Sequence, residues 1–170
     1  KDYFHPIKVG EKIVIKPSWV EYQAQPDELI IELDPGMAFG TGTHHTTAMC
    51  CRLLEDYVKP GETLFDVGTG SGILAVAAAK LGAVNIRAVD FDSVAVRVAK
   101  ENVEINQVQD VVTVGQADLL NGVEGQADVI LANIVADIII RLLPDIPARL
   151  KPGGRFIASG IIAERLADVT

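Results

Sequence analysis

The chain has 170 residues, which is enough for one domain that buries a continuous core without disulfides or metals. Hydrophobic residues make up 49% of it and charged residues 22%, a composition that excludes a disordered or fibrous protein. The formal net charge of −8 disfavours direct binding to the phosphate backbone of DNA or RNA, and no apolar run is long enough to suggest a membrane span.

The first part of the chain is predicted to be a small β appendage. Short strands are expected within Ile7 to Ile15 and from Leu29 to Leu33, around a turn at Gly10 and Glu11. We therefore expect residues 1–33 to form an appendage or linker region, and residues 34–170 to form the core domain.

The next segment, Asp34 to Thr47, combines turn-forming residues with a cluster of hydroxyls and then opens a helix. Thr46 or Thr47, near the start of that helix, could satisfy free main-chain amides or bind a ligand carboxylate. The loop could act as a lid. The buried stripe expected on the helix consists of Cys50, Leu53, Leu54 and Tyr57.

Two pairs of adjacent residues in this region invite a metal or redox interpretation. His44 and His45 have no cysteine or second histidine pair at ligand spacing, so we expect no metal site. Cys50 and Cys51 cannot bridge distant elements, because neighbours in one helix reach no remote partner. This cysteine usage indicates a reducing, cytoplasmic environment.

From Thr63 onward, short apolar runs alternate with helical patterns, which predicts a doubly wound α/β domain with a mostly parallel sheet. Gly82 is expected to close one helix, and Asp92 with Ser93 to cap the next. Pro144 and Pro147 should kink or divide the last helical stretch. The expected strands are Leu64 to Val67, Ile86 to Asp90, Val111 to Val114, Ala127 to Ala132 and Arg155 to Ser159, the last preceded by a turn at Pro152-Gly153-Gly154. The expected helices are Ile73 to Leu81, Ser93 to Asn106 and Val135 to Leu150.

A glycine-rich turn follows the first of these strands, with Gly68, Gly70 and Gly72 in a GxGxG pattern. Residues without a Cβ let the main chain approach a ligand laid across the strand ends. Asp90 ends the neighbouring strand, and its carboxylate can accept hydrogen bonds from both hydroxyls of a ribose. The turn and Asp90 together indicate an adenosine-type ligand.

A dinucleotide is the main competing ligand. Its GxGxxG pattern places the third glycine one position later, where this chain has Ile73. S-adenosylmethionine contains ribose and adenine but no phosphate, so the spacing favours it. The structural alternatives are a tight strand-to-helix connection for the turn and a helix cap for Asp90, a role that Asp92 could take instead.

Two further residues complete the expected pocket. Asp118 follows the third strand of the domain and could accept from an adenine amino group, while Asn133 follows the fourth and could align a nucleophilic nitrogen. Methyl transfer from a sulfonium requires mainly that the nucleophile be held in line and water excluded. The alternative for Asn133 is an ordinary turn residue at a strand end.

Seven segments spread over nearly the whole chain carry a resemblance to a known family. They are Phe4-His5-Pro6, Pro17-Ser18-Trp19, Asp34 to Thr47, Asp66 to Leu74, Asp90, Ala132-Asn133-Ile134 and Ser159-Gly160-Ile161. In these segments the chain resembles the bacterial ribosomal protein L11 methyltransferases, a family of Rossmann-like, S-adenosylmethionine-dependent enzymes that methylate amino groups, of lysine or the N-terminus, on that large-subunit protein. The resemblance implies cofactor contacts at Thr47, Gly68, Asp90 and Asn133, the last also near the transferred methyl, and it selects Thr47 over Thr46.

The resemblance also sets expectations about partners and missing parts. Family members begin with a separate substrate-recognition domain and end with a β-hairpin beyond the position of Thr170, and we expect this chain to lack both. The expected partner is a basic large-subunit ribosomal protein, with no direct nucleic acid and no membrane. The alternatives are a nucleic-acid base or small molecule as acceptor, or a non-catalytic cofactor-binding scaffold. Asn133 is followed by Ile134 and Val135 instead of Pro-Pro-aromatic, which favours a protein acceptor over a base.

Overall fold

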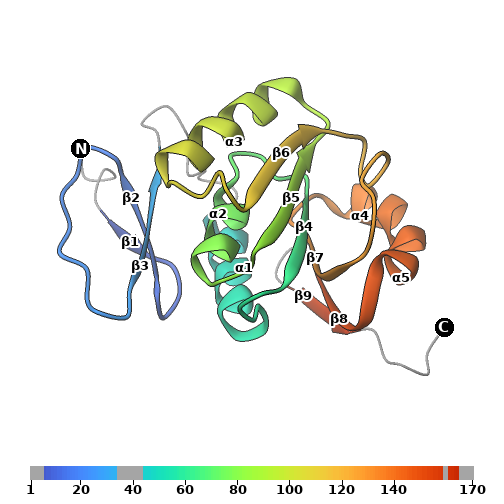
Figure 1. The fold of residues 1–170 in the computed structure, drawn as a ribbon, viewed down its shortest axis with the longest axis horizontal. Helices are drawn as coiled ribbons and strands as arrows, with labels where there is room; N and C mark the ends of the chain where they lie inside the picture. Colours follow the sequence, from blue (N-terminus) through green and yellow to red (C-terminus); the bar gives the residue numbers. More distant parts are fainter. Residues whose placement is uncertain (1–5, 34–43, 159–160, 165–170) are drawn as a thin grey trace.

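The computed structural model arranges the chain in four layers, seen edge-on in Figure 1. It describes residues 6–33, 44–158 and 161–164, with residues 44–46 and 161–164 as backbone alone. A small three-stranded sheet is followed by a layer of three helices, a six-stranded sheet and a second, shorter helical layer.

The large sheet has the strand order β6-β5-β4-β7-β8-β9. Its first five strands are parallel, and β9 pairs antiparallel with β8. The chain passes from β4 outward to β5 and β6, then returns to the other side of β4 to form β7 and β8. The predicted doubly wound, mostly parallel sheet is confirmed. Its strands are β4 (Thr63–Val67), β5 (Asn85–Asp90), β6 (Val112–Gln116), β7 (Ala127–Ala132), β8 (Leu150–Ala158) and β9 (Ile161–Glu164).

Helices cover both faces of this sheet because alternate residues of its buried strands point to opposite sides. Leu64 and Ile86 face the core shared with α1, α2 and α3, whereas Phe65 and Val89 face the core beneath α4 and α5. The prolines divide the last helical stretch as predicted, with a 3-10 turn, η1, between its two parts. The helices are α1 (His44–Tyr57), α2 (Ile73–Lys80), α3 (Ser93–Ile105), α4 (Ala136–Leu142), η1 (Leu143–Asp145) and α5 (Ile146–Arg149).

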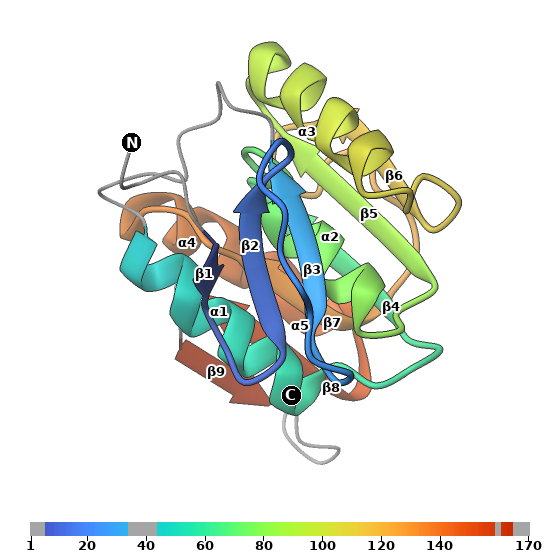
Figure 2. The same cartoon turned by 90° about the vertical axis from the view of Figure 1, so that its left-hand side faces the viewer.

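The predicted β appendage consists of β1 (Ile7–Lys8), β2 (Ile13–Pro17) and β3 (Leu29–Leu33). β1 runs antiparallel to β2, and β2 runs parallel to β3. The sheet lies against the α1 to α3 layer, as Figure 2 shows, and its buried residues share one apolar core with those helices. The carboxylate of Glu55 on α1 accepts hydrogen bonds from three main-chain N–H groups of the appendage, those of Glu11, Lys12 and Ile13. The division at residue 33 stays a prediction.

Two features at the end of the chain differ from the sequence prediction. The expected turn at Pro152-Gly153-Gly154 lies inside β8, where the pairing with β7 shifts between Leu150 and Arg155, so it interrupts the strand instead of preceding it. β9 was not predicted, because a four-residue edge strand carries too short a pattern to recognise. Among the described residues, no helix has the length and apolar character needed to cross a membrane.

Candidate functional site

The predicted site residues meet at one edge of the large sheet. Gly68 follows β4, Asp90 ends β5, Asp118 comes shortly after β6 and Asn133 follows β7. The strand register places Val67 opposite Ala132, and Asp90 opposite Gln116, so these carboxyl ends lie side by side. Because β5 and β7 flank β4, the edge contains the topological switch point at which open α/β sheets bind ligands.

The three glycines of the turn all have positive φ, which L side chains rarely adopt, but they differ in what an added side chain would meet. A Cβ on Gly68 would lie 2.3 Å from Cγ2 of Ile134, and one on Gly72 would lie 3.1 Å from Cβ of Ala99. A Cβ on Gly70 would meet no atom of the described residues within 4 Å. A side chain at either outer position would crowd a neighbour, most severely at Gly68, whereas one at Gly70 would meet none of the described residues. The sequence pattern alone had suggested ligand approach for all three.

Asp90 is bound to the turn it was predicted to complement. Its Oδ2 accepts a hydrogen bond from the main-chain N–H of Gly70, and its Oδ1 accepts one from Asp92, both at 2.9 Å. A carboxylate has about four acceptor positions, so each oxygen keeps one for a ligand hydroxyl. Asp90 is not the cap of α3, because Asp92 takes that role by accepting from the N–H of Val94.

Asp66 is a residue of this site that the sequence analysis did not single out. It is 1% exposed beneath the turn, and its Oδ2 accepts a hydrogen bond of 2.6 Å from the Thr69 hydroxyl. Burial raises the pKa of Asp66 to about 7; the bonds from Thr69 and the main chain of Ala75 oppose this rise, while the nearby Asp90 adds to it. A carboxylate within the apolar run Leu64 to Val67 was the available sequence signal.

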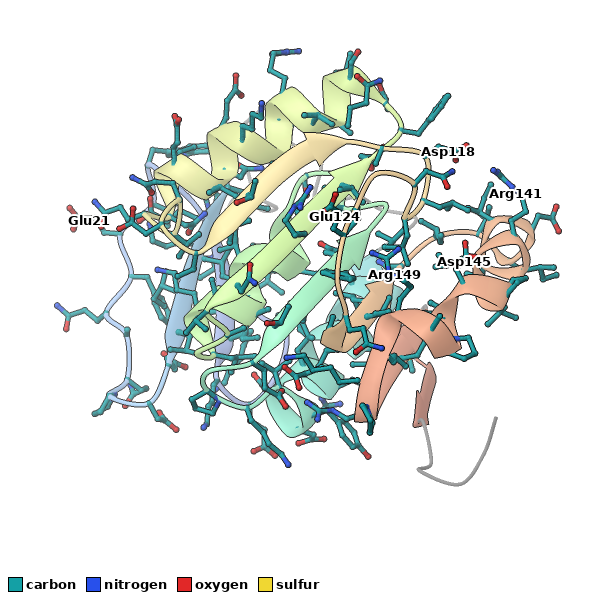
Figure 3. All side chains as sticks on the ribbon, turned by 45° about the vertical axis from the view of Figure 1, so that its right-hand side comes forward. Glu21, Asp118, Glu124, Arg141, Asp145 and Arg149 are labelled. Atoms are coloured by element: carbon teal, nitrogen blue, oxygen red, sulfur yellow. The ribbon has the colours of Figure 1, made fainter. Side chains whose placement is uncertain are left out.

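Asp118 lies on the rim of the site, next to the end of β5. The N–H of the preceding residue, Ala117, donates to the carbonyl of Asp90 at 3.0 Å. The Asp118 side chain is exposed and forms a 3.3 Å ion pair with Arg141 of α4, and Figure 3 shows both side chains on the same part of the surface. The main chain just before Asp118 therefore adjoins Asp90, whereas the Asp118 carboxylate is paired with a cation on α4.

Asn133 and Thr47 come from different elements, the end of β7 and helix α1. Asn133 is half-buried directly after β7, and the next residue, Ile134, has its side chain against Gly68. Thr47 is 7% exposed in the N-terminal part of α1, a helix that packs against α2. The turn opens α2, so α1 lies next to the helix that carries the glycine motif.

Residues 34–43, the rest of the loop that we expected to act as a lid, lie outside the described residues, as do the side chains of His44, His45 and Thr46. Where side chains are described, no group of three or more His, Cys, Asp or Glu residues could hold a metal ion.

The geometry fits a nucleoside that carries a positive charge and lacks phosphate. The open position over Gly70 provides room for a ligand next to the main chain, and Asp90 offers acceptors to ribose hydroxyls. Asp90 places a carboxylate at the turn, and a negative charge there favours a cation and disfavours a pyrophosphate. A sulfonium nucleoside meets both conditions.

Comparison with known proteins gives one consistent family. The family model for ribosomal protein L11 methyltransferase (PrmA) matches residues 1–170. The ribosomal protein L11 methyltransferase of Geobacillus thermodenitrificans is 59% identical over 170 residues, and that of Desulfitobacterium hafniense is 57% identical over 169. Each match covers 99% of this chain and 54% of the relative, so the chain spans about half the length of these curated relatives.

Solved structures agree with the sequence comparison. The crystal structure of ribosomal protein L11 methylase from Lactobacillus delbrueckii subsp. bulgaricus is similar with a TM-score of 0.82 and 40% identity, covering 92% of this chain and 79% of that one. An RNA methyltransferase from Salinibacter ruber, in complex with S-adenosyl-L-homocysteine, is similar with a TM-score of 0.58 and 25% identity, covering 66% of this chain and 72% of that one.

Proposed function

The chain belongs to the ribosomal protein L11 methyltransferase family, and from this we propose that it forms the S-adenosylmethionine-binding part of an enzyme that methylates amino groups of ribosomal protein L11. The observation that carries the proposal is the glycine turn hydrogen-bonded to Asp90 at the switch point of the sheet, with space over Gly70 that no described residue fills. We place the enzyme in the cytoplasm, where ribosomal proteins are made.

We assign the cofactor contacts residue by residue. Asp90 accepts from the ribose hydroxyls, and the turn from Gly68 to Gly72 supports the methionyl-adenosine part through its main chain. Asp118 accepts a hydrogen bond from the adenine amino group. To do so, its carboxylate either binds the amino group and Arg141 together or releases Arg141. Thr47, near the start of α1, is assigned to the cofactor through the family resemblance.

Asn133 is the residue we assign to the acceptor. When bound, S-adenosylmethionine supplies an activated methyl on a sulfonium, so the chain needs to position the nucleophile more than to activate it. The amide oxygen of Asn133 accepts a hydrogen bond from the substrate nitrogen and directs its lone pair into the site. The amine reaches the site uncharged, having lost its proton to solvent.

The acceptor is inferred from two independent properties. Relatives that are more than half identical are named for ribosomal protein L11. The formal net charge of −8 also complements a basic partner protein, whereas it would repel the backbone of an RNA. The division into an appendage at residues 1–33 and a core at 34–170 forms part of the same proposal.

The test is a labelling experiment with the full-length enzyme. It would be incubated with methyl-labelled S-adenosylmethionine, dissociated large-subunit ribosomal proteins and ribosomal RNA, and the products would be separated. We expect label in L11 on amine nitrogens. Label in the RNA would overturn the acceptor assignment, and label in neither fraction would favour a non-catalytic scaffold.

A further inference from the structure

Helix α3 contacts the glycine turn through a buried amide. Asn102 is 0% exposed, and its Nδ2 donates a hydrogen bond of 2.8 Å to the main-chain carbonyl of Ser71, between Gly70 and Gly72 of the turn. A buried amide that donates to a loop carbonyl fixes the orientation of that peptide group, because losing the donor would leave the carbonyl without compensation for its lost hydration.

The same face of α3 also meets the turn by close packing. Ala99, one helical turn before Asn102, is fully buried, and a Cβ added to Gly72 would lie 3.1 Å from the Ala99 Cβ and 3.3 Å from its Cα. Residues three apart lie on one side of a helix, so Ala99 and Asn102 form a single contact surface. Ala99 limits how closely the turn can approach the helix, and Asn102 binds the Ser71 carbonyl.

The start of α3 is connected to the turn by a second path. Gly70 donates to Asp90, and the other carboxylate oxygen of Asp90 accepts from the N–H of Asp92. Asp92 in turn caps α3 by accepting from Val94. The turn is therefore held from two directions: by Asp90 at the end of β5, just before α3, and by Asn102 on the body of the helix.

The far end of α3 is fixed independently of the turn. The Asn106 side chain pairs with the main chain of Glu32 on β3, accepting from its N–H at 2.7 Å and donating to its carbonyl at 2.8 Å. Asn102 is thus presented by a helix that is held at both ends, which makes its amide a rigid reference point for the turn.

We propose that Asn102 is a positioning residue that keeps the Gly68 to Gly72 turn in the shape that receives the cofactor, acting through the Ser71 carbonyl. The proposal rests on the proposed cofactor function of the turn. Without the amide, the Ser71 peptide can rotate, and the main chain around Gly70 loses the orientation that its bond to Asp90 requires. Cofactor binding then has to restore this order, so affinity falls.

The test compares Asn102→Ala and Asn102→Leu with Val103→Ala in the full chain. Both Asn102 variants remove the donor, one with a smaller side chain and one with an apolar side chain, so at least one should fold. Val103 is the next residue, also buried, and its truncation weakens the same helix without touching the turn. The readouts are the Kd for S-adenosylhomocysteine, measured well below the unfolding temperature, and amide hydrogen exchange across residues 68–72.

We expect the Kd to rise about tenfold in each folded Asn102 variant, with faster exchange in the turn, since one hydrogen bond to the turn is lost. Val103→Ala should keep the parent Kd within about twofold despite lower stability. Parent-like affinity and exchange in a folded Asn102 variant would overturn the inference, and so would an equal loss of affinity in Val103→Ala. Failure of the unaltered chain to bind the cofactor would instead contradict the proposed function.

Discussion

The main-chain N–H of Gly70 donates to Oδ2 of Asp90 across 2.9 Å, which joins the glycine turn after β4 to the acidic residue that ends β5. The two features that indicated an adenosine ligand are therefore one hydrogen-bonded unit. The bond orients the carboxylate before any ligand arrives, and preorganisation of this kind lowers the cost of binding.

Gly70→Ala should separate backbone strain from ligand exclusion. The substitution places a side chain at φ +58 and costs about 1–2 kcal/mol of stability. The new Cβ would occupy the space over the turn, so binding of S-adenosylhomocysteine should fall by at least about 100-fold. Gly61→Ala is the matched control, because Gly61 also has a positive φ and open surroundings but precedes β4 at the other end of the strand. Similar affinities in the two variants would show that the ligand does not lie over Gly70.

Asp66 should make the stability of the protein depend on pH. Burial raises its folded pKa to about 7 from the ordinary value of 3.8, so the folded state holds more protons than the unfolded state between those values. The stability from the protonated form is complete below about pH 4 and is lost as the pH rises through about 7. In urea denaturation, the free energy of unfolding should fall less between pH 5 and pH 8 in Asp66→Asn than in the parent. An equal fall in the two proteins would refute the assignment of this pH dependence to Asp66. The control is Asp110→Asn, at an exposed position, which should show the same fall as the parent.

Glu55→Ala should loosen the appendage from α1. The substitution removes the acceptor of three main-chain N–H groups, at Glu11, Lys12 and Ile13, and we expect a cost of about 1–3 kcal/mol in the free energy of unfolding. Glu101→Ala tests the specificity of the effect, since Glu101 forms an exposed 3.7 Å pair with Arg97 worth about 0.5 kcal/mol or less. Comparable denaturation midpoints for the two variants would argue against the anchoring role.

Asn133→Ala in the full-length enzyme should reduce turnover far more than cofactor affinity. If the amide aligns the acceptor nitrogen, kcat for L11 methylation falls by about 100-fold, while the Kd for S-adenosylhomocysteine changes by no more than about fivefold. A loss confined to cofactor affinity would instead assign Asn133 to the cofactor alone.

The sequence predicted the features of the fold that have strong local patterns. Apolar strands alternating with helical patterns predicted the parallel sheet. Asp92 was correctly predicted to cap the start of a helix, Gly82 to close one, and Pro144 and Pro147 to divide one. The carboxyl ends of parallel strands meet at one edge, so Asp90, Asp118 and Asn133 could be grouped before the structure was known.

Long-range contacts could not be predicted in this way. Asn102 lies in α3 and Asn106 directly follows it, and neither the bond to Ser71 nor the pairing with β3 follows from spacing along the chain. The space available to a side chain at Gly68 and at Gly72 likewise depends on Ile134 and Ala99, which are distant in sequence. The ion pair between Asp118 and Arg141 also joins residues that are distant in sequence, so the sequence pattern did not predict it.

Titration calorimetry of the chain and its Asp90→Ala variant with S-adenosylhomocysteine tests the central claim most directly. We predict that the chain binds one molecule of S-adenosylhomocysteine, that Asp90→Ala weakens binding by at least about 30-fold through the lost ribose contacts, and that NADH gives no heat of binding. Unchanged affinity in Asp90→Ala, or binding of NADH in preference to S-adenosylhomocysteine, would contradict the assignment of this edge of the sheet as an S-adenosylmethionine site.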